Sequence, residues 1–243
     1  VTGTFPAISY TENEIFAISG VVDIQIDGTS NNDLIGILVV GSDIEYRLGG
    51  TLIGTSSLVG TNSITVDAGE GDDSLTVDSA LAAAGIKVSY DGEGNNSANP
   101  GDVLNLLGAT DSVEYFFTNS SSGSIRIDDA LTDFIVYSGL EPITSTIDAV
   151  NVTLNYSGVS ETINISDATS GQTTVTSTAG ETLTFTNPTG SLIINTGAGD
   201  DIVNLVSLTD SFTASLTFNG DGDNDTVNAN GSVSFNTGKT IAF

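Results

Sequence analysis

Apolar and polar residues alternate along most of this chain, in short runs separated by turn-forming residues. In the second half these runs are rich in Thr, Val and Ile, and Gly, Asn, Asp or Ser lies between them. Alternation with a period of two is typical of half-buried strands. We therefore predict an all-β fold, with strands over residues 162–165, 174–176, 182–186, 191–195, 202–205, 215–219 and 226–228.

The same alternation predicts which side chains enter the core. Ile64 and Val66, and likewise Ile202 and Leu205, are expected to point inward, with the Thr, Ser, Asn and Asp residues around them pointing outward. One stretch, 79–85, contains four alanines and a leucine, but residues 207–213, which correspond to it in the repeat described next, lack the alanines. A loop or a single turn is therefore expected there rather than a long helix.

A tandem repeat divides the chain. Gly69-Glu70-Gly71-Asp72-Asp73 recurs as Gly197-Ala198-Gly199-Asp200-Asp201, at an offset of 128 in the numbering. In each copy a further Gly-x-Gly follows at an offset of 23, beginning at Gly92 and Gly220. Apolar positions of residues 22–26 match those of 150–154 at the longer offset. We predict an N-terminal apolar strand segment over 1–20, a first repeat over 21–141 and a second over 142–243, continuous with the first.

Two architectures fit such strands. A pair of β-sandwich domains is one, because a repeat of this length is close to the ~100 residues of an immunoglobulin-like domain. The other is a parallel β-helix or β-solenoid, in which coils of roughly 20 to 25 residues stack on one another. The inner spacing favours the solenoid, because stacked coils place equivalent turns one above another.

Composition excludes several partners and chemistries. The chain has 31 acidic and 4 basic residues, for a formal charge of −27, so nucleic acid and anionic membranes would be repelled. No apolar run approaches the ~20 residues that span a bilayer, so membrane insertion is not expected. Without Cys and His, the chain cannot form disulfides, thiolate or imidazole metal sites, or a Ser-His-Asp triad. We expect no enzymatic activity.

The glycine turns resemble a known family. Gly69 to Leu75 and Gly197 to Val203 both read Gly-x-Gly-x-Asp-x-apolar, the greater part of the RTX nonapeptide, and Gly28 to Ile35 reads Gly-x-x-Asn-Asn-Asp-x-Ile. The chain therefore resembles RTX-like β-roll proteins and giant repetitive bacterial surface proteins of the adhesin type. The resemblance implies structural calcium at Asp73 and Asp201, and we include the adjacent Asp72 and Asp200 as candidate ligands.

Two departures from the RTX pattern limit that resemblance. Single motifs stand far apart instead of running consecutively, and Ala68 and Thr196 replace the leading glycine, so a full calcium ladder is not expected. A second candidate stands on its own spacing: Asp221, Asp223 and Asp225 alternate in a glycine-containing loop, which suits the six to eight oxygens that Ca²⁺ takes. Asp91 and Glu93 belong to the corresponding loop of the first copy. The alternative is that Asp, Asn and Gly serve here only as turn formers.

The expected function follows from these features. We predict an extracellular or cell-surface structural protein, a repeat unit of a surface layer, adhesin or filament, stabilised by Ca²⁺. Its partners would be copies of itself or adjacent repeats joined head to tail through strand edges, with surface polysaccharide as a further candidate. The alternatives are a carbohydrate-binding or polysaccharide-degrading β-helix and an ice- or mineral-facing surface protein. Val1 in place of Met suggests a processed protein or a segment of a longer one.

Overall fold

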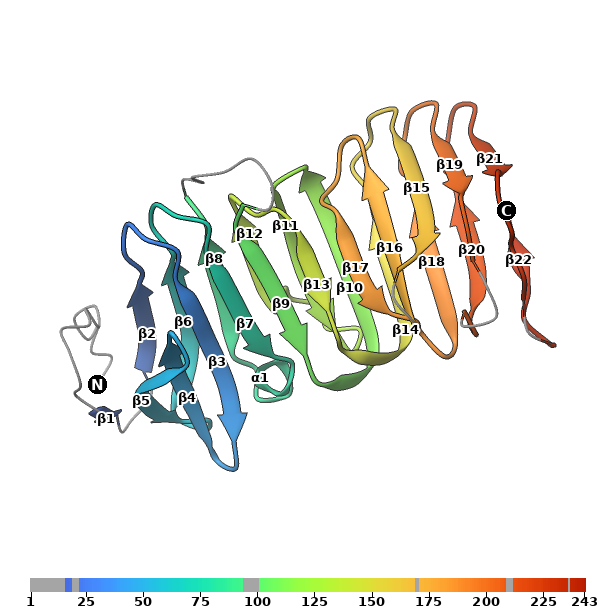
Figure 1. The fold of residues 1–243 in the computed structure, drawn as a ribbon. Helices are drawn as coiled ribbons and strands as arrows, with labels where there is room; N and C mark the ends of the chain where they lie inside the picture. The colour runs from blue at the N-terminus through green and yellow to red at the C-terminus, as the bar shows by residue number, and fades with distance from the viewer. Residues whose placement is uncertain (1–15, 19–21, 94–100, 169–170, 209–211, 236) are drawn as a thin grey trace.

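Two large β-sheets make up the protein (Figure 1). The computed structural model describes residues 16–18, 22–93, 101–168, 171–208, 212–235 and 237–243. Within them the strands form one sheet of twelve strands and one of ten, both mixed and neither closed into a barrel. The all-β prediction is confirmed. Most of the expected N-terminal segment, 1–20, lies outside the described residues.

Each sheet combines strands that are not consecutive in sequence. In spatial order, the twelve-stranded sheet contains β1 (Phe16–Ile18), β5 (Thr51–Ser57), β4 (Asp43–Leu48), β3 (Leu34–Val40), β7 (Ser74–Asp78), β9 (Val103–Leu107), β13 (Ile143–Ser145), β17 (Leu183–Thr186), β16 (Gln172–Ser177), β15 (Thr162–Asp167), β19 (Ile202–Leu205) and β21 (Thr226–Ala229). The ten-stranded sheet contains β2 (Val22–Asp27), β6 (Thr61–Asp67), β8 (Lys87–Asp91), β12 (Ile135–Ser138), β11 (Ser122–Ile127), β10 (Ala109–Asn119), β14 (Asp148–Asn155), β18 (Ser191–Asn195), β20 (Ser215–Asn219) and β22 (Ile241–Ala242). All seven strands predicted in the second half are present, within one or two residues at their ends.

Most neighbouring strands are parallel and come from successive passes of the chain. The chain leaves β6, forms β7 in the other sheet and returns as β8 beside β6. Ile64 of β6 pairs with Ile24 of the previous pass and with Val88 of the next. Parallel neighbours need a crossover connection, and here a strand of the opposite sheet supplies it. The pass from Ile24 to Ile64 is longer than the expected coil, because it contains extra strands.

Those extra strands belong to three antiparallel meanders, β3–β4–β5, β10–β11–β12 and β15–β16–β17. Each meander reverses the chain twice, so its third strand runs parallel to its first. As a result, every strand of a sheet points the same way except the middle strands β4, β16 and β11. The two end strands of each sheet therefore run in the same direction, β1 like β21 and β2 like β22.

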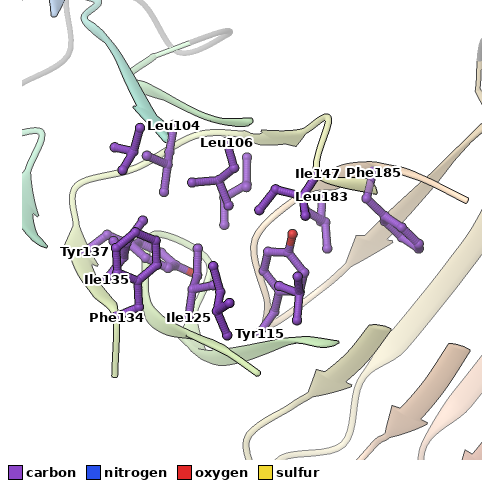
Figure 2. Packing of buried hydrophobic residues seen from close by; sticks show 14 of the residues in the cluster. Leu104, Leu106, Tyr115, Ile125, Phe134, Ile135, Tyr137, Ile147, Leu183 and Phe185 are labelled. Carbon is purple, nitrogen blue, oxygen red and sulfur yellow. The ribbon is translucent and has the colours of Figure 1, made fainter. Parts of the chain in front are cut away.

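Side chains from both sheets fill the space between them. Figure 2 shows Leu104 and Leu106 of β9 opposite Tyr115, Ile125 and Ile135 of the ten-stranded sheet. All five are at most 2% exposed. Burying each aliphatic side chain contributes roughly 1.5–3 kcal/mol, so this continuous core dominates the stability of the fold.

The predicted inward positions are correct at one strand and partly wrong at another. Ile64 and Val66 are fully buried as expected. Ile202, however, is 41% exposed, and Val203 enters the core with Leu205. Residue 205 lies three positions after residue 202, an odd step, so their side chains face opposite sides of a strand. At 80–83 the structure has a single helical turn, α1 (Ala80–Ala83), consistent with the expected loop or turn.

Strands related by the sequence offset of 128 hold matching places. β3 begins at Leu34 and β15 at Thr162, and both open a meander in the twelve-stranded sheet. The starts of β7 and β19, and of β8 and β20, differ by the same offset, and each pair shares a sheet.

Candidate functional site

A line of acidic residues crosses one margin of the twelve-stranded sheet, each lying one or two residues before a strand. Leu104 pairs with Ile143 and Ile143 with Leu183, so Asp102, Glu141 and Glu181, each two residues earlier, lie level. We call the whole set the acidic column; in spatial order it contains Asp33, Asp73, Asp102, Glu141, Glu181, Glu161, Asp201 and Asp225.

Within the acidic column, a carboxylate of one pass accepts the backbone N–H of the previous pass. Asp73 Oδ1 accepts the N–H of Asp33 at 2.6 Å, and Asp102 Oδ1 accepts that of Asp73 at 2.7 Å. In the second half Asp201 Oδ1 accepts the N–H of Glu161 at 2.9 Å, and Asp225 Oδ1 that of Asp201 at 3.1 Å. These contacts connect turns that are 24 to 40 residues apart in sequence.

Five column carboxylates keep a second oxygen that is buried and accepts no hydrogen bond from the described residues. These oxygens are Asp73 Oδ2, Asp102 Oδ2, Asp201 Oδ2, Glu161 Oε1 and Glu181 Oε2. Burying a charged oxygen without a partner disfavours the ionised form.

The acidity of the column is shifted accordingly. Burial raises the pKa of Asp102 to about 6, that of Glu161 to about 7 and that of Glu181 to about 8. Hydrogen bonds to each carboxylate act in the opposite direction, and neighbouring carboxylates add to the rise. These pKa values lie well above the ordinary range of carboxyl groups. At neutral pH the column therefore contains carboxyl groups that are still protonated.

A hollow of about 340 Å³ opens beside the middle of the column. Glu141 and Glu181 line it together with Ser120 and Ser177, and the remaining lining residues are Pro142, Gly180 and Thr182. The hydroxyl of Ser177 donates to Glu161 Oε2 and so connects the third glutamate of the column to a residue that lines this hollow.

The residues expected to hold calcium separate into two groups. Asp73 and Asp201 are 1% exposed and serve as the acceptors just described. Asp200 is exposed, and its Oδ1 accepts the N–H of Asn224 at 3.0 Å. Asp72 is half-buried, and its N–H donates to Asn32 Oδ1 at 3.2 Å. Asp72 and Asp73 thus differ in burial, as do Asp200 and Asp201.

The Asp221–Asp225 loop stacks on the preceding turn. Asp223 Oδ2 accepts the N–H of Gly199 at 3.1 Å, while Asp225 accepts that of Asp201. Asp221 and Asp223 take left-handed backbone angles, with φ of 59° and 75°. Gly197, level with Asp221, has φ of 86°. The register between these turns is therefore 24 residues, one more than the glycine spacing suggests.

Asp91 and Glu93 lie at the end of a second acidic row. Asp27, Asp67 and Asp91 are paired neighbours at the ends of β2, β6 and β8. The charge of Asp67 raises the pKa of Glu93. We call Asp27, Asp67 and Asp91 the aspartate row.

The second half carries amides in the same three places. Asn155, Asn195 and Asn219, which correspond to the aspartate row in the tandem repeat, form a hydrogen-bonded ladder. Asn195 Nδ2 donates to Asn155 Oδ1 at 2.6 Å, and Asn219 Nδ2 donates to Asn195 Oδ1 at 2.7 Å. An amide is both donor and acceptor, so this ladder satisfies itself. A carboxylate row cannot do so without a proton or a cation.

Over the described ranges, no three Asp or Glu side chains lie close enough together to hold a metal ion by themselves. Calcium at these turns would therefore need carbonyl, hydroxyl and water oxygens beside the carboxylates. No helix in those ranges is long and apolar enough to cross a membrane. Comparisons with protein-family models, with curated proteins and with solved structures found no match.

The glycine motifs do not reveal Asp102, Glu141, Glu161 or Glu181, and none of these four was predicted as a site residue. The sequence does contain a signal for them: an acidic residue, then any residue, then an aliphatic residue. Examples are Asp102-Val103-Leu104, Glu161-Thr162-Ile163 and Glu181-Thr182-Leu183. The Gly-x-Gly-x-Asp motifs indicate only two of the buried residues of the acidic column, Asp73 and Asp201.

Proposed function

We propose that this protein is an extracellular, non-enzymatic structural protein, a β-solenoid built from a tandem duplication, that assembles end to end with copies of itself or with adjacent repeats. Support for the solenoid comes from the repeated parallel returns of the chain and from its alternation between two sheets. Support for the duplication comes from the matching places of strands related by the sequence offset. Stacked repeats of this kind lengthen by adding passes.

Strand direction at the two ends carries the assembly proposal. Among the described residues, β21 and β22 each pair in parallel on one side only, with β19 and β20. At the other end β1 and β2 pair in parallel with β5 and β6. Because all four edges run in the common direction of their sheets, one molecule fits against the next with parallel pairing in both sheets. Such a head-to-tail contact is open and generates filaments.

The β21–β22 end also leaves apolar surface for a neighbour to cover. Phe243 is 78% exposed and stacks on Phe218, with ring centroids 5.8 Å apart. These two rings, with Val203 and Val227, line a hollow of about 380 Å³ at this end. Covering exposed apolar area favours association by about 25 cal/mol per Å².

Calcium is the cofactor that we propose at the exposed acidic turns. The aspartate row with Glu93, and Asp200 with the Asp221–Asp225 loop, place carboxylates on neighbouring passes. The chain has a formal charge of −27, and its four basic residues cannot neutralise it. A divalent cation at these turns offsets the repulsion between the carboxylates. Calorimetry of the chelated protein with Ca²⁺ tests this proposal; no heat and no change in melting temperature would end it.

Imaging tests the assembly proposal. Negative-stain electron microscopy and sedimentation should show fibres or end-to-end oligomers that shorten when a chelator is added. A monodisperse monomer that turns over a polysaccharide would replace this proposal with the carbohydrate-cleaving alternative.

A further inference from the structure

The hollow beside Glu141 and Glu181, which we call the glutamate pocket, differs from the glycine turns in position and chemistry. It lies at mid-molecule, between β13 and β17, whose residues Ile143 and Leu183 are paired. None of its lining residues belongs to a Gly-x-Gly-x-Asp turn. Glutamates stand here where aspartates stand earlier in the acidic column, so the carboxylates reach further from the backbone.

Glu181 is the central observation. It is 2% exposed and lines the pocket; Oε1 accepts the N–H of Thr182 at 3.1 Å, and Oε2 accepts nothing from the described residues. The neighbouring Tyr137 hydroxyl is also buried without a partner among those residues. The charge of Glu141 acts on Glu181 as well. A buried carboxylate oxygen without a partner among the described residues therefore lies at this hollow beside a second carboxylate, that of Glu141.

No cation of the described chain reaches this pocket. Arg47 pairs with Glu45, and Arg126 pairs with Asp133. The ammonium of Lys239 donates to the carbonyl oxygen of Thr189, and Lys87, on β8, lines a different hollow with Val136. Glu181 is therefore held neutral by its proton, or, when both glutamates are ionised, their counter-charge comes from solution.

We propose that the glutamate pocket binds a hard divalent cation, Ca²⁺, through Glu141 and Glu181 with hydroxyl and water oxygens completing its coordination. The donor set contains oxygen alone, which hard cations prefer. Ca²⁺ accepts irregular sets of oxygen ligands, such as two glutamates completed by hydroxyl and water oxygens, whereas Mg²⁺ requires a near-ideal octahedron. The volume of about 340 Å³ admits an ion with several waters, each of which takes about 30 Å³.

Ser177 and Glu161 support the pocket from behind. The Ser177 hydroxyl donates to Glu161 Oε2 and accepts the N–H groups of Ala179 and Gly180, both at 3.1 Å. These bonds hold the 177–180 turn, which leads directly to Glu181. Glu161 is in this account a positioning residue and not a ligand.

Terbium luminescence tests the proposal on the whole chain. Tb³⁺ replaces Ca²⁺ at oxygen sites and emits strongly when a nearby tyrosine is excited, and Tyr137 lies beside Glu181. We expect tyrosine-sensitised emission that Ca²⁺ displaces. In Glu141→Gln/Glu181→Gln the Tb³⁺ affinity at this site should fall at least about tenfold. Tyr137→Phe should remove most of the emission while calorimetry still detects the bound ion.

Two further results separate this site from the exposed turns. Asp27→Asn/Asp67→Asn/Asp91→Asn, which neutralises the aspartate row, should leave the emission sensitised by Tyr137 in place. Circular dichroism of each variant confirms folding, and glutamine preserves the volume of glutamate. Emission unchanged in the double glutamine variant, or no Ca²⁺-displaceable emission at all, would overturn the proposal. The assembly of the protein plays no part in either readout.

Discussion

Asp73 Oδ1 accepts the backbone N–H of Asp33 at 2.6 Å, across 40 residues of sequence. Asp201 makes the same contact with Glu161 in the second half. The aspartates of the Gly-x-Gly-x-Asp turns therefore join one pass of the chain to the previous one. A turn that supports its predecessor in this way stabilises the structure whether or not a metal ion is bound.

Removing that acceptor should destabilise the protein. Asp73→Ala leaves the N–H of Asp33 without a partner, whereas Asp73→Asn keeps an oxygen in place and removes the charge. The alanine variant should unfold more easily than the asparagine variant by about 1–3 kcal/mol, measured by urea denaturation. Equal stability of the two variants would show that the contact contributes nothing.

Stability should depend on pH through the column. The folded pKa of Asp102 is about 6 against an ordinary 3.8, and that of Glu161 is about 7 against 4.5. Between these values the folded protein binds more protons than the unfolded chain, so the free energy of unfolding falls as pH rises. The contribution of these two groups is fully present below about pH 4 and is lost as pH rises through about 6 for Asp102 and about 7 for Glu161.

Neutral variants check the pH prediction. Asp102→Asn and Glu161→Gln should each reduce the fall in the free energy of unfolding between about pH 4 and 7 by on the order of 1 kcal/mol, and so flatten the decline in melting temperature. Both variants keep the neighbouring carboxylates. These are Asp72, Asp73 and Glu141 near Asp102, and Asp201 near Glu161. A wild-type melting temperature that rises through this range would contradict the assignment.

Exchanging the aspartate row for the amides of the second half should stabilise the calcium-free protein. Asp27→Asn/Asp67→Asn/Asp91→Asn removes like charges on paired strands and permits the ladder seen in the second half. Cross-strand pairs contribute roughly 0.2–1 kcal/mol each, so we expect a gain of about 1 kcal/mol by thermal denaturation. The converse change, Asn195→Asp, should destabilise; a loss in the triple variant would refute the equivalence.

Close stacking of turns makes one glycine essential. A Cβ at Gly28 would lie 2.0 Å from the carbonyl oxygen of Ala68, whereas a Cβ at Gly222 meets nothing within 4 Å. Gly28→Ala should cost about 3 kcal/mol, and Gly222→Ala should change stability by less than about 0.5 kcal/mol. Melting curves of the two variants compare them directly; similar midpoints would mean that the passes are less tightly stacked.

Local patterning is enough to predict the strands. Runs such as residues 191–195 and 215–219 alternate cleanly, and β18 and β20 occupy those residues. The misplaced Ile202 is an error of parity: Val203 and Leu205 share one face of the strand, while Ile202 shares the other face with the polar Asn204, so strict alternation assigns 203 and 205 to the core.

Local pattern can mark the members of the acidic column but cannot align them with one another. They align only through a register whose sequence spacing varies from strand to strand. Ile35 pairs with Leu75, Leu75 with Leu104, and Leu104 with Ile143, at three unequal spacings. Meanders and loops of differing length cause these changes. The glutamate pocket depends on that register, since its two glutamates come together only after β13 and β17 pair.

The open edge of β21 tests the central claim most directly. Thr226 and Asn230 donate their N–H groups to β19, at the carbonyls of Asp201 and Leu205. Because alternate residues of a strand face opposite neighbours, the N–H of Ala229 points to the open side. Proline at this position removes the donor, and serine keeps it.

Sedimentation and negative-stain imaging of Ala229→Pro and Ala229→Ser, with wild type, measure the consequence. End-to-end assembly through parallel strand pairing predicts that wild type and Ala229→Ser form filaments or end-to-end oligomers, while Ala229→Pro stays folded but remains monomeric. Filaments of equal length in all three proteins, or monomers in all three, would contradict it.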